Sequence, residues 1–146
     1  MATSSALDTL IELATKETDE AAKRLGTSMK AAEDTEQKLA LLMQYRDDYS
    51  ARFQQSLSTG LTAMGYRNFQ VFMDKLEQAI SGQQLVVRDA HARVDRERSA
   101  WQASERKRMS YGTLANRALK AKQLAENKRD QKQTDEHAAR LFQYKR

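Results

Sequence analysis

The fold class is decided by residues 68–101, NFQVFMDKLEQAISGQQLVVRDAHARVDRERSAW. One set of side chains in this stretch recurs every seven residues: Met73, Ile80, Val87, Val94 and Trp101. A second set is interleaved with the first: Phe69, Leu76, Gln83 and Ala90. Two interleaved seven-residue repeats form one stripe along a helix, which is typical of a coiled coil. We therefore predict a long helix over about residues 68–143, packed by this stripe against a partner helix.

The expected partner is a helix over about residues 5–57. Its apolar residues lie at helical spacing: Leu7, Leu10, Ala14, Ala21, Leu25, Met29, Ala32, Leu39, Leu42, Phe53 and Leu57. Between the helices, residues 58–67 read STGLTAMGYR and contain Gly60 and Gly65, which predicts a turn. Two long helices joined by a short turn fold back on each other, so the expected fold is all-α. We predict one domain over residues 1–146, an antiparallel coiled-coil hairpin.

The second helix is predicted to be longer than the first. Past Trp101 the repeat weakens at Arg108, and we expect it to resume around Leu114, Ala118 and Leu119 after a register shift near Gly112. With a turn centred near Ala63, Leu7 lies beside about position 119, so roughly the last 25 residues have no partner within the chain. Such an overhang is frayed, self-associated or held by another protein, and we favour the last.

Composition excludes several classes of protein. The chain has 146 residues with no proline, five glycines and no cysteine, and its mean hydropathy is −0.82. Few residues therefore interrupt a helix, and disulfides, thiol nucleophiles and zinc ribbons are excluded. No stretch approaches the roughly 18 consecutive apolar residues of a membrane-spanning helix. The N-terminus lacks the features of a secretory signal, so we expect a cytosolic protein.

No motif for catalysis is present. The sequence has no G-x-x-x-x-G-K-[ST] phosphate loop, no G-x-G-x-x-G, no H-E-x-x-H and no G-x-S-x-G. His91 and His137 each stand among charged residues on a helix, where a solvated side chain is favoured over a metal ligand. We therefore predict a protein that is not an enzyme and that binds no metal or cofactor.

Charge is distributed unevenly along the chain. Residues 1–84 hold 9 Lys and Arg against 12 Asp and Glu, whereas residues 85–146 hold 16 against 8. The basic second half is suited to phosphates, an anionic membrane face or an acidic protein channel. Arginines cluster around Trp101, but acidic residues are interspersed among them and Trp101 lies on the heptad. A solvated coiled-coil face is therefore favoured over a nucleic-acid site.

Two segments are candidates for binding other proteins. Near the turn, apolar residues are in excess on both helices: Leu42, Tyr45 and Tyr49 on the first, and Phe72, Leu76 and Ala79 on the second. They form either a widened core or an exposed interaction site, and the pattern alone leaves both open. The second segment, residues 124–138, is polar on all sides, which favours a frayed tail over a binding element.

Four stretches together resemble the FliJ family of the bacterial flagellar type III export apparatus. They are ALDTLIELATKE at residues 6–17, followed by Leu25 and Gly26; LLMQYRDDY at 41–49; NFQVFMDKLEQAI at 68–80; and AENKRDQKQTDE at 125–136. The resemblance covers essentially the whole chain. It is the ordered set, with matching length and turn position, that is specific, since a single heptad stretch recurs in unrelated proteins.

The resemblance implies a fold and a set of partners. Family members are antiparallel two-helix coiled coils, similar to the central stalk of rotary ATPases, with the end that carries both termini inserted in the hexameric flagellar export ATPase (FliI). They promote assembly of this ring, bind the cytoplasmic linker of the export gate membrane protein (FlhA) and interact with substrate-specific export chaperones. The chain is accordingly expected to be a monomer when it is free. Its expected location is cytoplasmic, with peripheral association with the inner membrane at the flagellar base, and it is expected to be needed for flagellum assembly and motility.

The resemblance also implies which residues act. The positions that match the family's gate-binding residues are Leu42, Tyr45, Tyr49, Phe72, Leu76 and Ala79. Candidate contacts with the ATPase or a chaperone are Glu126, Asn127, Asp130, Gln131, Lys132 and Asp135. Lys38 and Gln83 depart from the family pattern and are not predicted to bind. Two alternatives remain, a self-associating structural coiled coil and, less favoured, a basic nucleic-acid-binding helical protein.

Overall fold

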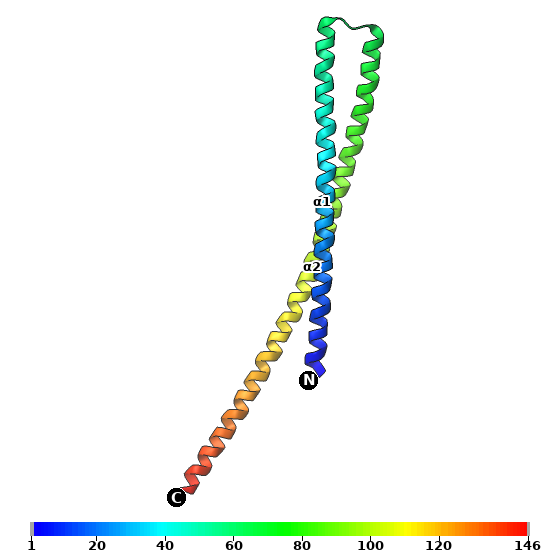
Figure 1. Cartoon of the computed structure of the whole chain (residues 1–146). Coiled ribbons are helices and arrows are strands. Elements are labelled where there is room, and N and C mark those ends of the chain that lie inside the picture. The colour runs from blue at the N-terminus through cyan, green and yellow to red at the C-terminus, as the bar shows by residue number, and fades with distance from the viewer. Residues whose placement is uncertain (1, 146) are drawn as a thin grey trace. The chain divides into compact units, whose positions relative to one another are not determined.

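The computed structural model describes the backbone of residues 2–145 and the side chains of residues 5–145. It contains two α-helices, α1 (Ala2–Thr59) and α2 (Ala63–Tyr144), and no strand in the described part (Figure 1). The helices have 58 and 82 residues. The all-α prediction is therefore confirmed, with both helices slightly longer than expected.

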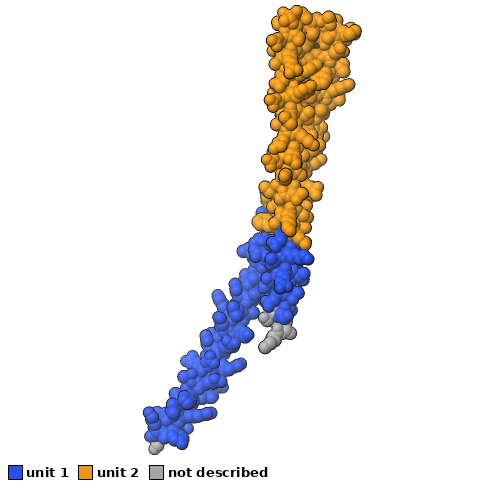
Figure 2. Space-filling view, in the orientation of Figure 1, with its two compact units in different colours: residues 1–19, 102–146 blue, residues 20–101 orange. Residues whose placement is uncertain are grey.

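The chain divides into two compact units, coloured separately in Figure 2. Unit 2 comprises residues 20–101, and it contains the loop with the adjoining parts of both helices. Unit 1 comprises residues 1–19 and 102–146. In each unit a segment of α1 packs against a segment of α2. Ion pairs join the two helices in both units, Arg24 to Glu97 at 3.4 Å in unit 2 and Glu17 to Lys107 at 3.7 Å in unit 1. Within unit 2, Arg46 of α1 also lies 3.7 Å from Glu77 of α2. Since the later residue of α1 pairs with the earlier residue of α2, the helices in this unit run antiparallel, as the hairpin prediction requires.

A regular seam runs along each helix. Buried and half-buried residues recur at alternating steps of four and three, the spacing of a coiled coil. On α1 the seam positions are Leu7, Ile11, Ala14, Thr18, Ala21, Leu25, Ser28, Ala32, Thr35, Leu39, Leu42, Arg46, Tyr49, Phe53 and Ser56. On α2 they are Phe69, Met73, Leu76, Ile80, Gln83, Val87, Ala90, Val94, Glu97, Trp101, Ser104, Arg108, Tyr111 and Ala115.

Three apolar residues predicted for the α1 stripe lie outside its seam. Leu10, Met29 and Leu57 are 41%, 48% and 50% exposed. The positions next to them, Ile11, Ser28 and Ser56, occupy the seam instead. The physical reason is that a helix with a single partner buries only one narrow stripe, so spacing decides burial and hydrophobicity alone does not.

The predicted register shift on α2 is wrong. Leu114, Ala118 and Leu119 are exposed, and the seam continues without a break to Ala115. Leu114, Leu119 and Leu124 are five residues apart, which turns each about 140° from the previous one, so they share no face. The described residues from 116 to 145 are all exposed. This stretch is longer than predicted because the loop is centred at Leu61 rather than near Ala63.

Small polar residues lie in the α1 seam because their hydroxyl groups bond to their own helix. Thr18 and Ser28 are each only 5% exposed. Thr18 Oγ1 donates to the Ala14 carbonyl at 2.8 Å, and Ser28 Oγ donates to the Leu25 carbonyl at 2.7 Å. No buried side-chain nitrogen or oxygen among the described residues lacks a hydrogen-bond partner. Burial of these hydroxyls therefore leaves no unpaired donor, which would cost about 1–3 kcal/mol.

Directional contacts between the helices fix the register within unit 2. The Gln83 side-chain amide donates to the backbone carbonyl of Thr35 at 2.9 Å. Next to Thr35, Glu36 lies within ion-pair distance of His91 Nε2. Closer to the loop, Arg46 lies 3.7 Å from Glu77. Apolar packing alone tolerates a slip of one heptad, whereas these bonds connect particular residues.

The connection between the helices is shorter than the predicted turn. Only residues 60–62 lie outside the helices, and Gly65 is already in the first turn of α2. Gly60 has a φ of 100°, a conformation that is strained for residues with a side chain. Thr62 is the N-cap of α2, because its Oγ1 accepts a hydrogen bond from the backbone N–H of Gly65 at 3.0 Å.

We predict that the part of the α1 seam formed by alanine, serine and threonine is packed too closely to accept a larger side chain. Ala21 is fully buried at 0% exposure, so Ala21→Leu should lower the free energy of unfolding by about 1–3 kcal/mol. The matched control is Ala51→Leu, because Ala51 is exposed on α1 in the same unit. Urea unfolding followed by circular dichroism measures both. A stability at Ala21→Leu equal to or above that of the control would show that this part of the seam is loosely packed.

Candidate protein-interaction surfaces

Aromatic side chains gather at the loop-proximal end of unit 2. The chain has ten aromatic residues, and six of them lie here. They are Tyr45, Tyr49, Phe53, Tyr66, Phe69 and Phe72. The two helices stand visibly apart near the loop in Figure 1. Aromatic rings of α1 contact aromatic rings of α2 in this part of the unit. The core is therefore widened at this end, which is one of the two arrangements that the sequence pattern left open.

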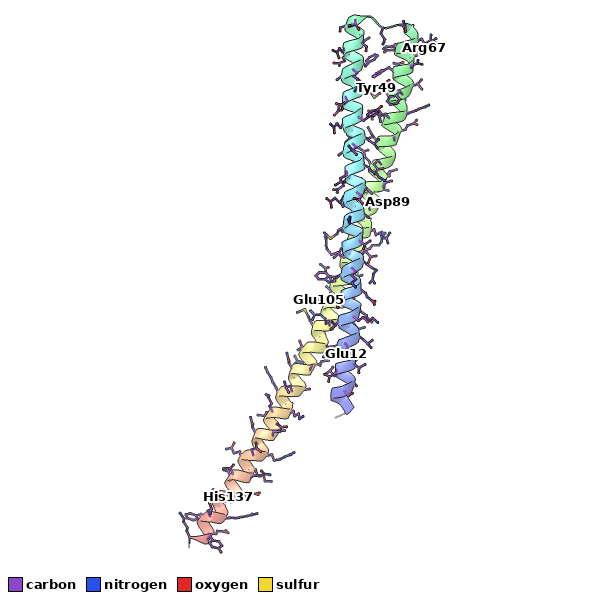
Figure 3. The ribbon with its side chains drawn as sticks, in the orientation of Figure 1. Glu12, Tyr49, Arg67, Asp89, Glu105 and His137 are labelled. Carbon is purple, nitrogen blue, oxygen red and sulfur yellow. The ribbon has the colours of Figure 1, made fainter. Side chains whose placement is uncertain are left out.

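The rings form a continuous stack across the two helices. Phe53 and Phe69 lie nearly parallel with centroids 3.6 Å apart, and Tyr49 also stacks on Phe69, with centroids 5.2 Å apart. Phe72 contacts Tyr49 at 4.4 Å and Tyr45 at 6.0 Å. Such pairs contribute about 0.5–1.5 kcal/mol each beyond area burial. Figure 3 labels Tyr49 in this part of unit 2.

The six residues predicted near the turn, here called the loop-proximal patch, differ in exposure. Leu76 is buried, with 6% of its surface exposed. Leu42, Tyr49 and Phe72 are half-buried, whereas Tyr45 is 51% exposed and Ala79 is also exposed. The loop-proximal patch is thus both a widened core and a surface, with the exposed part formed by Tyr45 and Ala79 beside the edge of Phe72.

The exposed part of the patch continues along one face of α2. Phe72, Ala79 and Val86 are seven residues apart, so they lie in one row beside the seam. Val86 is 47% exposed, and Leu41 of α1, one helical turn from Tyr45, is 66% exposed. Val86 and Leu41 were not predicted, although the seven-residue step from Phe72 and Ala79 is a signal that identifies Val86.

Two polar residues border the patch. Lys38 is exposed and lies one further heptad from Tyr45 along α1. Gln83 has a structural role, because its amide bonds to the Thr35 carbonyl between the helices. Neither residue was predicted to bind a partner.

The six residues predicted in the C-terminal segment are all exposed on α2. Glu126, Asn127, Asp130, Gln131, Lys132 and Asp135 lie beyond Ala115, the last seam residue. Gln131, Lys132 and Asp135 border one shallow hollow together with Lys128, Glu136 and Ala139. Side chains three and four residues apart on one helix are neighbours, which explains this grouping. The segment is thus a helix whose polar side chains are accessible from all sides.

A charged residue occupies the seam of unit 1. Arg108 is half-buried, and its guanidinium group bonds both carboxylate oxygens of Glu105, at 2.5 and 3.3 Å. The hydrogen bond that Arg108 donates to Glu105 raises the pKa of Arg108, and the negative charge of Glu105 raises it further. Glu105 lies one turn before Arg108 on the same helix, and this bidentate contact balances the positive charge of Arg108.

Membrane spans and metal sites are absent from the described part of the chain. Neither α1 nor α2 contains an apolar stretch that could span a membrane. No group of three or more His, Asp or Glu side chains there is arranged to hold a metal ion.

We predict that the loop-proximal patch separates into a stabilising and an accessible part. Leu76→Ala should lower the free energy of unfolding by about 2–4 kcal/mol, because Leu76 is buried. Tyr45→Ala should have a distinctly smaller effect, because about half of Tyr45 is already exposed. Urea unfolding measures both variants. Equal destabilisation would show that the Tyr45 ring contacts carry as much stability as the buried leucine.

The whole chain matches a known family. The family model described as "Flagellar FliJ protein" matches residues 3–146. The protein of that name from Salmonella typhi is 34% identical over 140 residues, which cover 96% of this chain and 95% of the relative. The one from Escherichia coli strain K12 has the same identity and coverage. The match spans both helices, the loop-proximal patch and the C-terminal segment, so this chain belongs to the FliJ family of flagellar proteins.

Proposed function

We propose that this chain is a non-catalytic component of the flagellar protein export apparatus, which couples the export ATPase to the export gate. The observation that carries the proposal is the family match over residues 3–146. The structure supports it with two accessible surfaces of different chemistry on one helical chain. One is the aromatic loop-proximal patch in unit 2, and the other is the polar C-terminal segment in unit 1.

The loop-proximal patch is the proposed contact with the cytoplasmic linker of the export gate. Tyrosine is enriched at the energetic centres of protein interfaces, because its ring buries a large area with little loss of conformational entropy. Here the ring of Tyr45 is held by Tyr49 and Phe72 and is still half exposed. A side chain fixed before binding loses less entropy on binding. We assign the accessible members Tyr45, Phe72 and Ala79 to direct contact, and buried Leu76 to support beneath them.

The C-terminal segment is the proposed contact with the export ATPase ring or with export chaperones. Residues 116–144 are exposed although they are helical, and the stretch 124–138 within them carries polar side chains on all sides. A helix that is polar all round gains little from packing in water, so a surrounding partner with complementary polar groups would stabilise it. Glu126, Asn127, Asp130, Gln131, Lys132 and Asp135 are the proposed contacts.

The proposed mechanism is mechanical. A chain bound to the ATPase by one segment and to the gate by another can transmit the nucleotide state of the ring, provided its affinity for the gate differs between those states. No residue has to exchange a proton or form a covalent bond. The proposed location, at the cytoplasmic side of the flagellar base, follows from these partners.

The first prediction concerns the gate contact. Ala79→Glu should weaken binding to the gate's cytoplasmic linker more than fivefold, because it places a charge in the accessible row between Phe72 and Val86. Isothermal titration with the purified linker measures the affinity. Ala51→Glu is the matched control, an exposed alanine of the same unit outside the row. If both variants bind as tightly as the parent chain, the row is not the contact.

The second prediction concerns the ATPase. With nonhydrolysable ATP, the full chain should join a ring-sized complex with the export ATPase in size-exclusion chromatography with light scattering, at about one copy per ring. A chain ending at Leu124 should lose this association, because it lacks the proposed contact residues. Its seam ends at Ala115, so circular dichroism should show the same unfolding midpoint for the hairpin.

Either failure has a defined meaning. If the shortened chain still joins the ring, residues 125–146 do not form the contact. If the full chain does not bind the ATPase and instead forms oligomers, the self-associating coiled coil replaces the export role. If the chain binds a nucleic acid without any partner protein, and the affinity falls steeply as the salt concentration rises, the basic nucleic-acid-binding alternative is favoured.

A further inference from the structure

The loop end of unit 2 exposes a second group of apolar side chains, separate from the loop-proximal patch. Leu57 is 50% exposed, Leu61 37%, Met64 70% and Tyr66 44%. These four residues, here called the apolar tip, occupy the last turn of α1, the loop and the first turn of α2. The connection is only three residues long, so the four side chains lie at one end of the unit (Figure 1).

The charge pattern around the apolar tip is distinctive. No Asp or Glu occurs between Asp48 and Asp74, a stretch of 25 residues in a chain that holds 20 acidic residues. Within that stretch lie two cations, Arg52 and Arg67. Neither guanidinium group is paired with a carboxylate among the described residues. The tip is therefore apolar at its end and cationic just behind it.

The distances along the helices fit an anionic lipid surface. Met64 and Leu61 are at the end itself, whereas Arg67 lies about 6 Å and Arg52 about 10 Å behind it, at 1.5 Å per residue. Apolar side chains of peripheral proteins enter about 5–10 Å, to the boundary between headgroups and acyl chains. Arginines set back by this amount lie at the level of the lipid phosphates, and their flexible stems let them adjust.

The acidic residues nearest to the tip lie behind the two arginines. Asp48 is four residues, about 6 Å, behind Arg52 on α1, and Asp74 is seven residues, about 10 Å, behind Arg67 on α2. On each helix an arginine is therefore the charged group closest to the tip. Because electrostatic interactions weaken with distance in salt, attraction of the arginines to lipid phosphates exceeds repulsion by the more distant carboxylates.

Three hydroxyl groups next to the apolar tip already have hydrogen-bond partners. Ser58 Oγ donates to the Gln55 carbonyl at 2.7 Å, and Thr59 Oγ1 donates to the Ser56 carbonyl at 3.1 Å. Thr62 Oγ1 accepts from the Gly65 N–H at 3.0 Å. Loss of water on entering the interface thus leaves these hydroxyl groups with partners, which lowers the cost of insertion.

We propose that the apolar tip inserts into the surface of an anionic membrane, with Arg52 and Arg67 contacting lipid phosphates.

The most basic stretch of the chain, residues 106–125, is a weaker candidate for insertion. It has no acidic residue, but its exposed leucines Leu114, Leu119 and Leu124 are about 140° apart and form no apolar face. The tip combines the two properties that interfacial binding requires, an exposed apolar group and cations close behind it. This inference needs no other protein and does not depend on the proposed export role.

The test uses the absence of cysteine in the chain. Full-length Thr62→Cys carries an environment-sensitive fluorophore at the tip, and full-length Thr134→Cys carries it in the C-terminal segment. Each is mixed with vesicles of phosphatidylcholine and phosphatidylglycerol, and with vesicles of phosphatidylcholine alone. On the anionic vesicles the label at residue 62 should shift to shorter wavelength and be quenched by lipid-attached quenchers. The label at residue 134 should show neither change.

Variants then test each part of the proposal in the Thr62→Cys background. Leu61→Asp should reduce vesicle partitioning about tenfold, because it replaces an inserted apolar group with a charge. Leu85→Asp is the matched control, an exposed leucine on α2 outside the tip, and should have no effect beyond that of one added negative charge. The double variant Arg52→Gln, Arg67→Gln should remove the preference for phosphatidylglycerol. Circular dichroism verifies that each variant is folded.

Three results would overturn the proposal. The first is a shift of the label at residue 134 with none at residue 62, which would assign vesicle binding to the C-terminal segment. The second is binding that Leu61→Asp and Leu85→Asp weaken equally. The third is no shift at residue 62 on anionic vesicles, which would leave the apolar tip free for a protein partner.

Discussion

The structure depends on a single constraint: each helix has one partner, and only one stripe of each is removed from water. Every seam position from Leu7 to Ser56 and from Phe69 to Ala115 follows from alternating steps of four and three residues. There is no second layer to compensate for an error in this spacing. The chain therefore gains its stability from the continuity of the stripe, and the rest of its surface is free for other uses.

Much of the fold follows from the sequence because the heptad of α2 is strong. Met73, Ile80, Val87, Val94 and Trp101 are large or branched and strictly spaced, and the structure places all of them at the seam. The pattern on α1 was weaker evidence, because its seam includes alanine, serine and threonine. Leu10 and Met29 have the hydrophobicity of core residues but lie off the stripe. Thr18 and Ser28 are buried because each bonds to the preceding turn, a compensation that a count of apolar residues does not include.

The candidate site was predictable in position but not in detail. The excess of apolar residues near the turn indicated where the surface lies. It did not separate buried Leu76 from exposed Tyr45, because this requires the pairing of the two helices. The loop was predicted too long because Gly65 is a typical turn residue, whereas the cap formed by Thr62 starts α2 before it. The exposed part of α2 beyond Ala115 is longer than predicted for a related reason, because the loop is centred at Leu61 and not near Ala63.

The bond from Gln83 to the Thr35 carbonyl has a consequence for how such a chain changes in length during evolution. A single residue inserted between Thr35 and the loop rotates the following part of α1 by about 100° and moves its whole stripe off the seam. A gain of seven residues restores the stripe with the least change of twist, and the same gain on α2 is then needed to keep Gln83 opposite Thr35. Drift in length is thus easiest in the three loop residues and in the segment beyond Ala115, while the two arms of unit 2 lengthen or shorten together.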